Sequence, residues 1–237
     1  MTDGLQVFET KALLDQHVAG WLTQLAAAST DRFRVALSGG TTPQSMYRLL
    51  AEEPLRARFP WSRVHWYWGD ERFVAHDDPA SNYAMAWVEF LSKVPAPESN
   101  IHAIPVDGTP DSAAQRYEDE LKRTYGADQL DPARAFFDVN LMGIGADGHT
   151  ASLLPDTDVL NERNRWVTPV MRGRPQVRIT LTYPLLESSR YVAFLVSGRG
   201  KTKALRRVLG GDTALPAARL KSQGETIWFT DAEAVVG

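Results

Sequence analysis

Residues 138–150 read Asp-Val-Asn-Leu-Met-Gly-Ile-Gly-Ala-Asp-Gly-His-Thr. The first part is mostly apolar and predicts a buried strand, and the glycines that follow predict a tight loop at its carboxyl end. Because the three glycines at 143, 145 and 148 carry no Cβ, a ligand can approach this backbone closely. The loop ends on His149, and Asp147 is close enough in sequence to orient its ring. The pattern favours an active-site loop.

Outward from this stretch, strand-like apolar runs alternate with helical patterns. We predict strands over 5–8, 33–37, 64–68, 136–142, 166–170, 177–181, 191–196 and 226–229. We predict helices over 10–28, 43–52 and 110–125, and two more that begin near Ser81 and Gly200. This alternation predicts an α/β fold with a doubly wound, mostly parallel, Rossmann-like sheet and helices on both faces. No linker is evident, so we expect residues 1–237 to form a single domain.

Composition narrows the class of protein. The net charge is −3 and the isoelectric point is about 6.0, which disfavours a nucleic-acid partner. The chain has no cysteine, which excludes disulfides, thiolate metal sites and a cysteine nucleophile. Residues 1–5 do not resemble a signal peptide, and no apolar run is long enough to span a membrane. We therefore expect a cytoplasmic protein without a membrane partner.

Two glycine-containing loops follow strands and open helices. The first is Ser38-Gly39-Gly40-Thr41-Thr42-Pro43, in which Pro43 suits a first helical turn and Thr41 or Thr42 suits its cap. Such a loop is either a phosphate cradle or an ordinary capped turn. The loop at 197–201 repeats the pattern and adds Lys201. If the two loops face one another, their N–H groups, hydroxyls and ammonium can clamp a phosphate.

Two further loops carry charged side chains. Residues 68–72 read Trp-Gly-Asp-Glu-Arg, which is either a solvated turn or part of a site. Residues 143–148 match the Gly-x-Gly-x-x-Gly dinucleotide pattern, but no acidic residue lies at the required distance beyond it, because Asp158 and Glu162 follow too soon. We therefore reject a dinucleotide site.

The remaining histidines are interpreted as structural, because a lone histidine usually is. His76 is followed by two aspartates, but three adjacent residues on regular structure cannot all face one ion. We predict no metal site. The histidines in this group are His17, His65, His76 and His102.

Six stretches together carry a family resemblance. They are Leu37–Pro43, Trp68–Arg72, Ser81–Tyr83, Gly143–Leu153, Arg178–Thr182 and Gly198–Lys201. In this order they resemble the 6-phosphogluconolactonase family, within a wider group that includes glucosamine-6-phosphate deaminase. The resemblance covers essentially the whole chain. It implies an α/β fold and hydrolysis of 6-phospho-D-glucono-1,5-lactone to 6-phosphogluconate in the oxidative pentose phosphate pathway, without a metal or organic cofactor.

The resemblance also implies roles for individual residues. His149 would deprotonate a water, with Asp147 or Asp70 orienting the imidazole. The glycine-loop N–H groups or Arg72 would receive the oxyanion. The phosphate ligands implied are Ser38, Gly39, Gly40, Thr41 and Lys201, and the remaining substrate contacts are Arg72, Asn82 and Arg178. The stretch before Arg178 is more basic than the family pattern, so Arg172 or Arg174 is a further candidate for substrate contact.

Two alternatives stay open. A deaminase-isomerase uses an acid a few residues beyond the histidine, in an Asn-Glu-Pro context, whereas this chain has Leu154 before Pro155. The deaminases also carry an aromatic residue after their Asp-Glu, where this chain has Arg72. A non-catalytic sugar-phosphate sensor would usually carry a basic helix-turn-helix, and none precedes the first predicted strand. We expect a monomer or weak homodimer.

Overall fold

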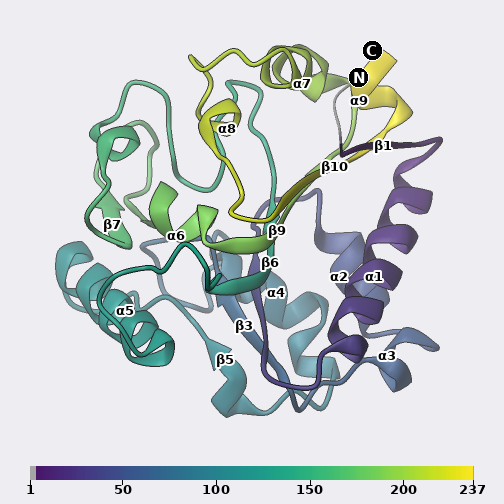
Figure 1. The fold of residues 1–237 in the computed structure, drawn as a ribbon, viewed down its shortest axis with the longest axis horizontal. Coiled ribbons are helices and arrows are strands. Elements are labelled where there is room, and N and C mark those ends of the chain that lie inside the picture. The colour runs from purple at the N-terminus through teal and green to yellow at the C-terminus, as the bar shows by residue number, and fades with distance from the viewer. Residues whose placement is uncertain (1–3, 237) are drawn as a thin grey trace.

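The central sheet of the computed structural model, which describes residues 4–236, contains seven strands, and all their pairings are parallel. Its order is β1-β10-β9-β6-β2-β3-β5 (Figure 1). The strands are β1 (Leu5–Phe8), β2 (Phe33–Leu37), β3 (Val64–Trp68), β5 (Ile101–His102), β6 (Phe137–Met142), β9 (Ser189–Val196) and β10 (Glu225–Asp231). The predicted α/β fold with a mostly parallel sheet is confirmed. Strand β5 was not predicted, because two residues carry no readable pattern.

Helices lie on both sides of this sheet, with α1 and α2 on one side and α5 and α6 on the other (Figure 1). They are α1 (Lys11–Ala28), α2 (Gln44–Leu50), α3 (Leu55–Arg58), α4 (Asn82–Glu89), α5 (Pro110–Tyr125), α6 (Tyr183–Glu187), α7 (Thr202–Leu209), α8 (Pro216–Arg219) and α9 (Ala232–Val236). The sequence did not predict α3, α6, α8 and α9, each of which is too short to show a helical period.

Helix α5 shows how local sequence fixes an element. Thr109 and Ser112 form a reciprocal capping box, Pro110 occupies the first turn and Gly126 ends the helix in the left-handed region, with φ +79°. These signals are all local. The predicted range 110–125 is therefore confirmed at both ends.

A second sheet corrects the sequence prediction. Strands β4 (Asp70–Arg72), β8 (Arg178–Leu181) and β7 (Val167–Val170) form a separate antiparallel sheet in the order β4-β8-β7. We expected residues 68–72 to be a loop. We expected residues 166–170 and 177–181 to be strands of the mostly parallel sheet. Consecutive strands joined by a short connection can pair antiparallel, which β7 and β8 do. The pairing of β4 with β8 sets Asp70 opposite Thr180 and Arg72 opposite Arg178.

The strand order places a crevice at the middle of the central sheet. From β2 the chain proceeds outward through β3 to β5, whereas β6 leads the other way through β9 to β10. The order therefore reverses between β2 and β6, and open α/β sheets bind ligands at the carboxyl ends of the strands at such a point. Ser38 follows β2 and Gly143 follows β6, so both loops open onto this crevice.

The two sheets share one hydrophobic core. Buried side chains of the central sheet and of β7 and β8 belong to a single cluster, which includes Val139, Phe194, Val167 and Leu181. This common core supports our proposal of one domain over residues 1–237. Among residues 4–236, no helix is both long and apolar enough to cross a bilayer.

Candidate active site

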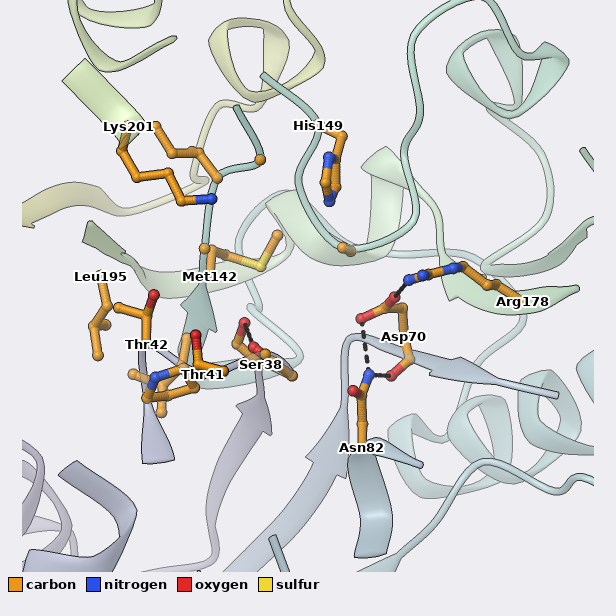
Figure 2. A pocket seen from close by; sticks show the side chains of 18 of the residues that line it. Ser38, Thr41, Thr42, Asp70, Asn82, Met142, His149, Arg178, Leu195 and Lys201 are labelled. Atoms are coloured by element: carbon orange, nitrogen blue, oxygen red, sulfur yellow. Dashed lines mark hydrogen bonds and ion pairs between the residues drawn. The ribbon is translucent and has the colours of Figure 1, made fainter. Parts of the chain in front are cut away.

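A pocket of about 230 Å³ lies at the crevice between β2 and β6. Figure 2 shows Lys201 on one side of the pocket, Asp70 with Arg178 on the other, and His149 between them. Apart from Asp147, all the site residues predicted from sequence line it: Ser38, Gly39, Gly40, Thr41, Asp70, Arg72, Asn82, His149, Arg178 and Lys201. Segments far apart in the chain therefore converge on one cavity.

The loop after β2 presents backbone and hydroxyl groups to the pocket. The Tyr47 hydroxyl fixes it by accepting from Ser38 N–H and donating to Ser38 C=O, each at 2.9 Å. The predicted threonine cap of the next helix is wrong: the N-cap of α2 is Pro43, without a side-chain hydrogen bond. Thr41 and Thr42 remain directed at the pocket (Figure 2). Among residues 4–236, the N–H groups of 39–42 donate no hydrogen bond, so they are available to a ligand.

Glu71, which the sequence placed beside the site, has a structural role. Its side chain is 1% exposed and accepts hydrogen bonds from the N–H groups of Arg72, Asn82 and Tyr83 and from the Ser81 hydroxyl. Burial raises the pKa of Glu71, and these four hydrogen bonds oppose that rise. The carboxylate therefore fixes the start of α4 to β4 rather than facing a ligand.

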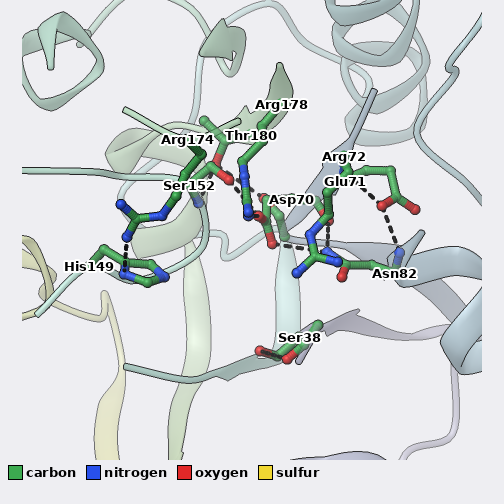
Figure 3. Close-up of polar contacts among 12 residues, drawn as sticks. Ser38, Asp70, Glu71, Arg72, Asn82, His149, Ser152, Arg174, Arg178 and Thr180 are labelled. Carbon is green, nitrogen blue, oxygen red and sulfur yellow. Dashed lines mark hydrogen bonds and ion pairs between the residues drawn. The ribbon is translucent and has the colours of Figure 1, made fainter. Parts of the chain in front are cut away.

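Asp70 contacts three polar side chains that come from different segments. Its carboxylate accepts from the Ser152 hydroxyl at 2.5 Å and the Asn82 amide at 3.3 Å, and it lies 3.5 Å from Arg178 Nη1 (Figure 3). Across the described part of the chain, these are its side-chain polar partners, and His149 is not among them. The imidazole of His149 is therefore paired with Asp147, whereas Asp70 is paired with Arg178 and Asn82.

Three cationic side chains line the pocket. Arg72 and Arg178 face each other across the β4–β8 pair, and their buried Nε atoms have no hydrogen-bond partner among residues 4–236. Burial lowers the pKa of Arg178, Asp70 opposes that shift, and Arg72 and Arg174 add to it. With Lys201 entering from the opposite wall, the cations outnumber Asp70, the carboxylate that lines the pocket. Such a site suits an anionic ligand.

The glycine loop after β6 is shaped around the histidine. A Cβ on Gly145 would overlap the imidazole of His149 and the carboxylate of Asp147, so only glycine fits. Gly145 N–H donates to His149 C=O at 2.8 Å and Gly148 N–H to Gly145 C=O at 3.0 Å. No helix follows directly, which agrees with the rejection of a dinucleotide site, because that motif must open a helix.

His149 belongs to a three-residue cluster. Its Nδ1 lies 2.5 Å from Asp147 Oδ1, and Arg174 Nη2 lies 2.6 Å from Asp147 Oδ2. Arg174 Nη2 also lies 3.0 Å from the same Nδ1 (Figure 3). Partial burial acts to raise the pKa of Asp147, but hydrogen bonds from Arg174 and His149 outweigh it and hold that pKa well below its usual range. The sequence proposed Arg172 or Arg174 for substrate contact, whereas Arg172 lines a separate hollow.

The loop before α7 differs from the sequence expectation. The Ser197 hydroxyl and the Gly198 N–H donate to the carboxylate of Asp231, which also accepts from Ala234 N–H at 2.8 Å. Two groups expected to bind phosphate therefore already have a partner. Lys201 remains the pocket-lining group of this loop. Asp231 was missed because only the parallel pairing of β10 with β9 places it there.

The other histidines have protein partners. His65 contacts His102, which contacts Glu120, and His76 contacts Ile104 C=O. His17 packs between Phe8 and Phe229. Among residues 4–236, no group of three or more histidine or carboxylate side chains is arranged to hold a metal ion.

Fold and site together define an α/β protein with an anion-suited pocket at the point where the strand order reverses. Residues 9–228 match the family described as glucosamine-6-phosphate isomerases/6-phosphogluconolactonase, and the chain belongs to this family. Two curated relatives named 6-phosphogluconolactonase support this. The Nostoc protein is 41% identical, with 90% of this chain and 88% of the relative covered. The Synechocystis protein is 39% identical, with 94% and 92% covered.

Solved structures agree with the fold. The crystal structure of 6-phosphogluconolactonase from Thermotoga maritima has a TM-score of 0.81 and 30% identity, with 96% of this chain and 99% of that chain covered. A monomeric glucosamine-6-phosphate deaminase has a TM-score of 0.82 at 22% identity, with 98% of each chain covered. Because both activities occur on this fold, the fold does not distinguish them.

Proposed function

We propose that this chain hydrolyses 6-phospho-D-glucono-1,5-lactone to 6-phospho-D-gluconate, a step of the oxidative pentose phosphate pathway. The observation that carries the proposal is that His149, held at Nδ1 by Asp147, lines the same pocket as three cations and the glycine-threonine loop. The relatives described above support the enzyme class directly, and the chain is a hydrolase of this kind. The reaction details below are our proposal.

The phosphate binds on the Lys201 side of the pocket. Lys201 supplies a charge, and the loop at 38–41 supplies hydroxyls together with the N–H groups of residues 39–41, which have no partner among residues 4–236. Charge-assisted hydrogen bonds of this kind are the strong ones in anion recognition. On the opposite side, Arg72, Asn82 and Arg178 contact the sugar, held in place by Asp70 and the second sheet. The lactone carbonyl then lies between the two sides, where His149 is found.

His149 acts as general base. Its Nδ1 faces Asp147, so Nε2 is the nitrogen available to a water. The water gives a proton to Nε2 as its oxygen adds to the lactone carbonyl, and Arg72 or the glycine-loop N–H groups stabilise the oxyanion. The bond from the carbonyl carbon to the ring oxygen then breaks, and the ring oxygen takes the proton back from the imidazolium. The product acid releases its proton to solvent. No metal or cofactor takes part.

The deaminase alternative lacks its acid in this chain. Leu154 is 1% exposed and belongs to the hydrophobic core, so neither its side chain nor its position serves proton transfer. The nearby Ser152 hydroxyl donates to Asp70. We expect the purified chain to convert the phosphorylated lactone faster than its spontaneous hydrolysis and to release no ammonia from glucosamine 6-phosphate. Ammonia release without lactone turnover would overturn the proposal, and binding without either reaction would identify a sensor.

The setting of the reaction stays a prediction. We propose a cytoplasmic monomer or weak homodimer whose partner is the small sugar-phosphate lactone rather than a nucleic acid or a membrane. The negative net charge disfavours a nucleic-acid partner. Light scattering of the purified chain measures its mass in solution.

A further inference from the structure

Arg174 contacts the catalytic pair without lining the pocket. It lies on the connection between β7 and β8, and its Nη2 reaches Asp147 Oδ2 at 2.6 Å and His149 Nδ1 at 3.0 Å. Its other terminal nitrogen, Nη1, donates to Gly173 C=O at 2.9 Å. Both ends of the guanidinium therefore have protein partners. Figure 3 shows Arg174 on the Nδ1 side of the imidazole.

Proton positions follow from these distances. The pKa of Asp147 lies well below its usual range, so this carboxyl is ionised and accepts hydrogen bonds at both oxygens. One oxygen accepts from Arg174 and the other from His149 at 2.5 Å, which places a proton on Nδ1. The Arg174–Nδ1 approach is then an approach of two donors. The guanidinium is tolerated this close to the protonated Nδ1 because the negative carboxylate of Asp147 accepts from both groups.

The loop that carries Arg174 is anchored beside the site. Gly173 adopts φ +90°, a backbone conformation that favours glycine, and a Cβ there would meet Leu154 at 3.0 Å. The guanidinium is therefore presented by a turn packed against the segment that follows His149. This packing limits how far Arg174 can move from Asp147.

We propose that Arg174 is a positioning residue for the lactone hydrolysis. It fixes the second oxygen of Asp147, and the carboxylate in turn holds His149 with Nδ1 protonated and Nε2 free to accept a proton from water. A carboxylate held at only one oxygen can rotate, and the imidazole then loses its fixed orientation and tautomer. The expected effect on kcat rests on the proposed function. The expected orientation and tautomer of the imidazole do not depend on it.

Kinetics of Arg174→Gln, Arg174→Lys and the control Arg172→Gln give the first test. We expect Arg174→Gln to lower kcat about ten- to a hundredfold with little change in KM, as a misoriented catalytic group does. Arg174→Lys should recover much of the loss, since it can still pair with Asp147, and Arg172→Gln should match the wild type. Unchanged kcat, or a raised KM with unchanged kcat, would overturn the positioning role, and the latter would assign Arg174 to substrate binding.

Nitrogen NMR of the imidazole gives the second test, which needs no substrate. In protein labelled with ¹⁵N-histidine, the signals absent from His149→Gln identify this ring. We expect the wild type and Arg174→Lys to show a protonated Nδ1 and an unprotonated Nε2, and Arg174→Gln to show the two shifts drawn together. Identical spectra for the wild type and Arg174→Gln would overturn the inference. If the wild type hydrolyses no lactone, the proposed function fails, whereas the NMR comparison still decides the role of Arg174.

Discussion

Gly39 packs its α-carbon directly against the side-chain amide of Asn82, so closely that a Cβ on Gly39 would overlap that amide. The contact joins the loop after β2 to the start of α4. Asn82 also donates to Asp70 C=O at 2.8 Å, so the same amide links the glycine loop to β4. One buried side chain, that of Asn82, therefore fixes the distance between the two walls of the pocket.

Replacing Gly39 tests this link. We expect Gly39→Ala to destabilise the chain by about 1–3 kcal/mol, because the new methyl group must displace Asn82. Lactone turnover should fall as well. Gly20→Ala is the matched control: Gly20 lies within α1 with nothing near the added Cβ, so the change should be neutral or stabilising. Denaturant unfolding of both variants measures the difference, and a Gly39→Ala protein as stable as Gly20→Ala contradicts the packing argument.

Removing the imidazole tests the general base. We expect His149→Ala to fold normally and to lower kcat for the phosphorylated lactone by about two to four orders of magnitude, the usual contribution of a positioned base. The rate is measured with spontaneous hydrolysis subtracted, and circular dichroism checks the fold. Near-normal kcat in this variant would show that another group activates the water.

Phosphate recognition is tested at Lys201. Since the phosphate is remote from the reacting carbonyl, we expect Lys201→Ala to raise KM for the phosphorylated lactone about ten- to a hundredfold and to leave turnover of unphosphorylated gluconolactone nearly unchanged. Lys203, exposed on α7, provides the control Lys203→Ala, which should behave as the wild type. Equal losses of Lys201→Ala on both substrates would place the phosphate elsewhere or make Lys201 structural.

Asp147 makes stability depend on pH. Its pKa in the folded chain lies below the ordinary value of 3.8, so the folded state favours the ionised form and gains stability that is fully present above about pH 4. That gain is lost as the pH falls toward the folded-state pKa. We expect wild type to be more stable than Asp147→Asn at pH 7, with the gap narrowing below pH 4. If the difference in stability between wild type and Asp147→Asn widened on acidification, the pKa shift of Asp147 would have the opposite sign. The control is Asp128→Asn, a change at an exposed aspartate.

The central sheet and the glycine loop could be predicted from sequence because their signals are local. Apolar runs such as 33–37 and 64–68 mark buried strands, and the glycines around His149 mark a loop that must make room for its ring. Antiparallel pairing of β4 with β8 joins residues over 100 positions apart, and no local pattern encodes that register.

The side-chain roles that depend on this register were correspondingly harder to predict. Glu71 and Asp70 are adjacent and chemically alike, yet one is buried against the start of α4 and the other faces the pocket. Successive side chains of a strand point to opposite faces, which separates them once β4 is known to be a strand. Arg174 and Asp231 act through contacts that only the folded chain creates.

The most direct test of the proposed function is the initial rate at which the purified chain converts 6-phospho-D-glucono-1,5-lactone to 6-phosphogluconate. The lactone is generated in place, spontaneous hydrolysis is subtracted, and the assay is run with and without EDTA. We expect an enzyme-dependent rate far above the spontaneous one, unaffected by the chelator and lowered by about two to four orders of magnitude in His149→Ala. A rate no greater than the spontaneous one, or activity lost to EDTA and restored by a divalent ion, would contradict the metal-free lactone hydrolysis proposed for this pocket.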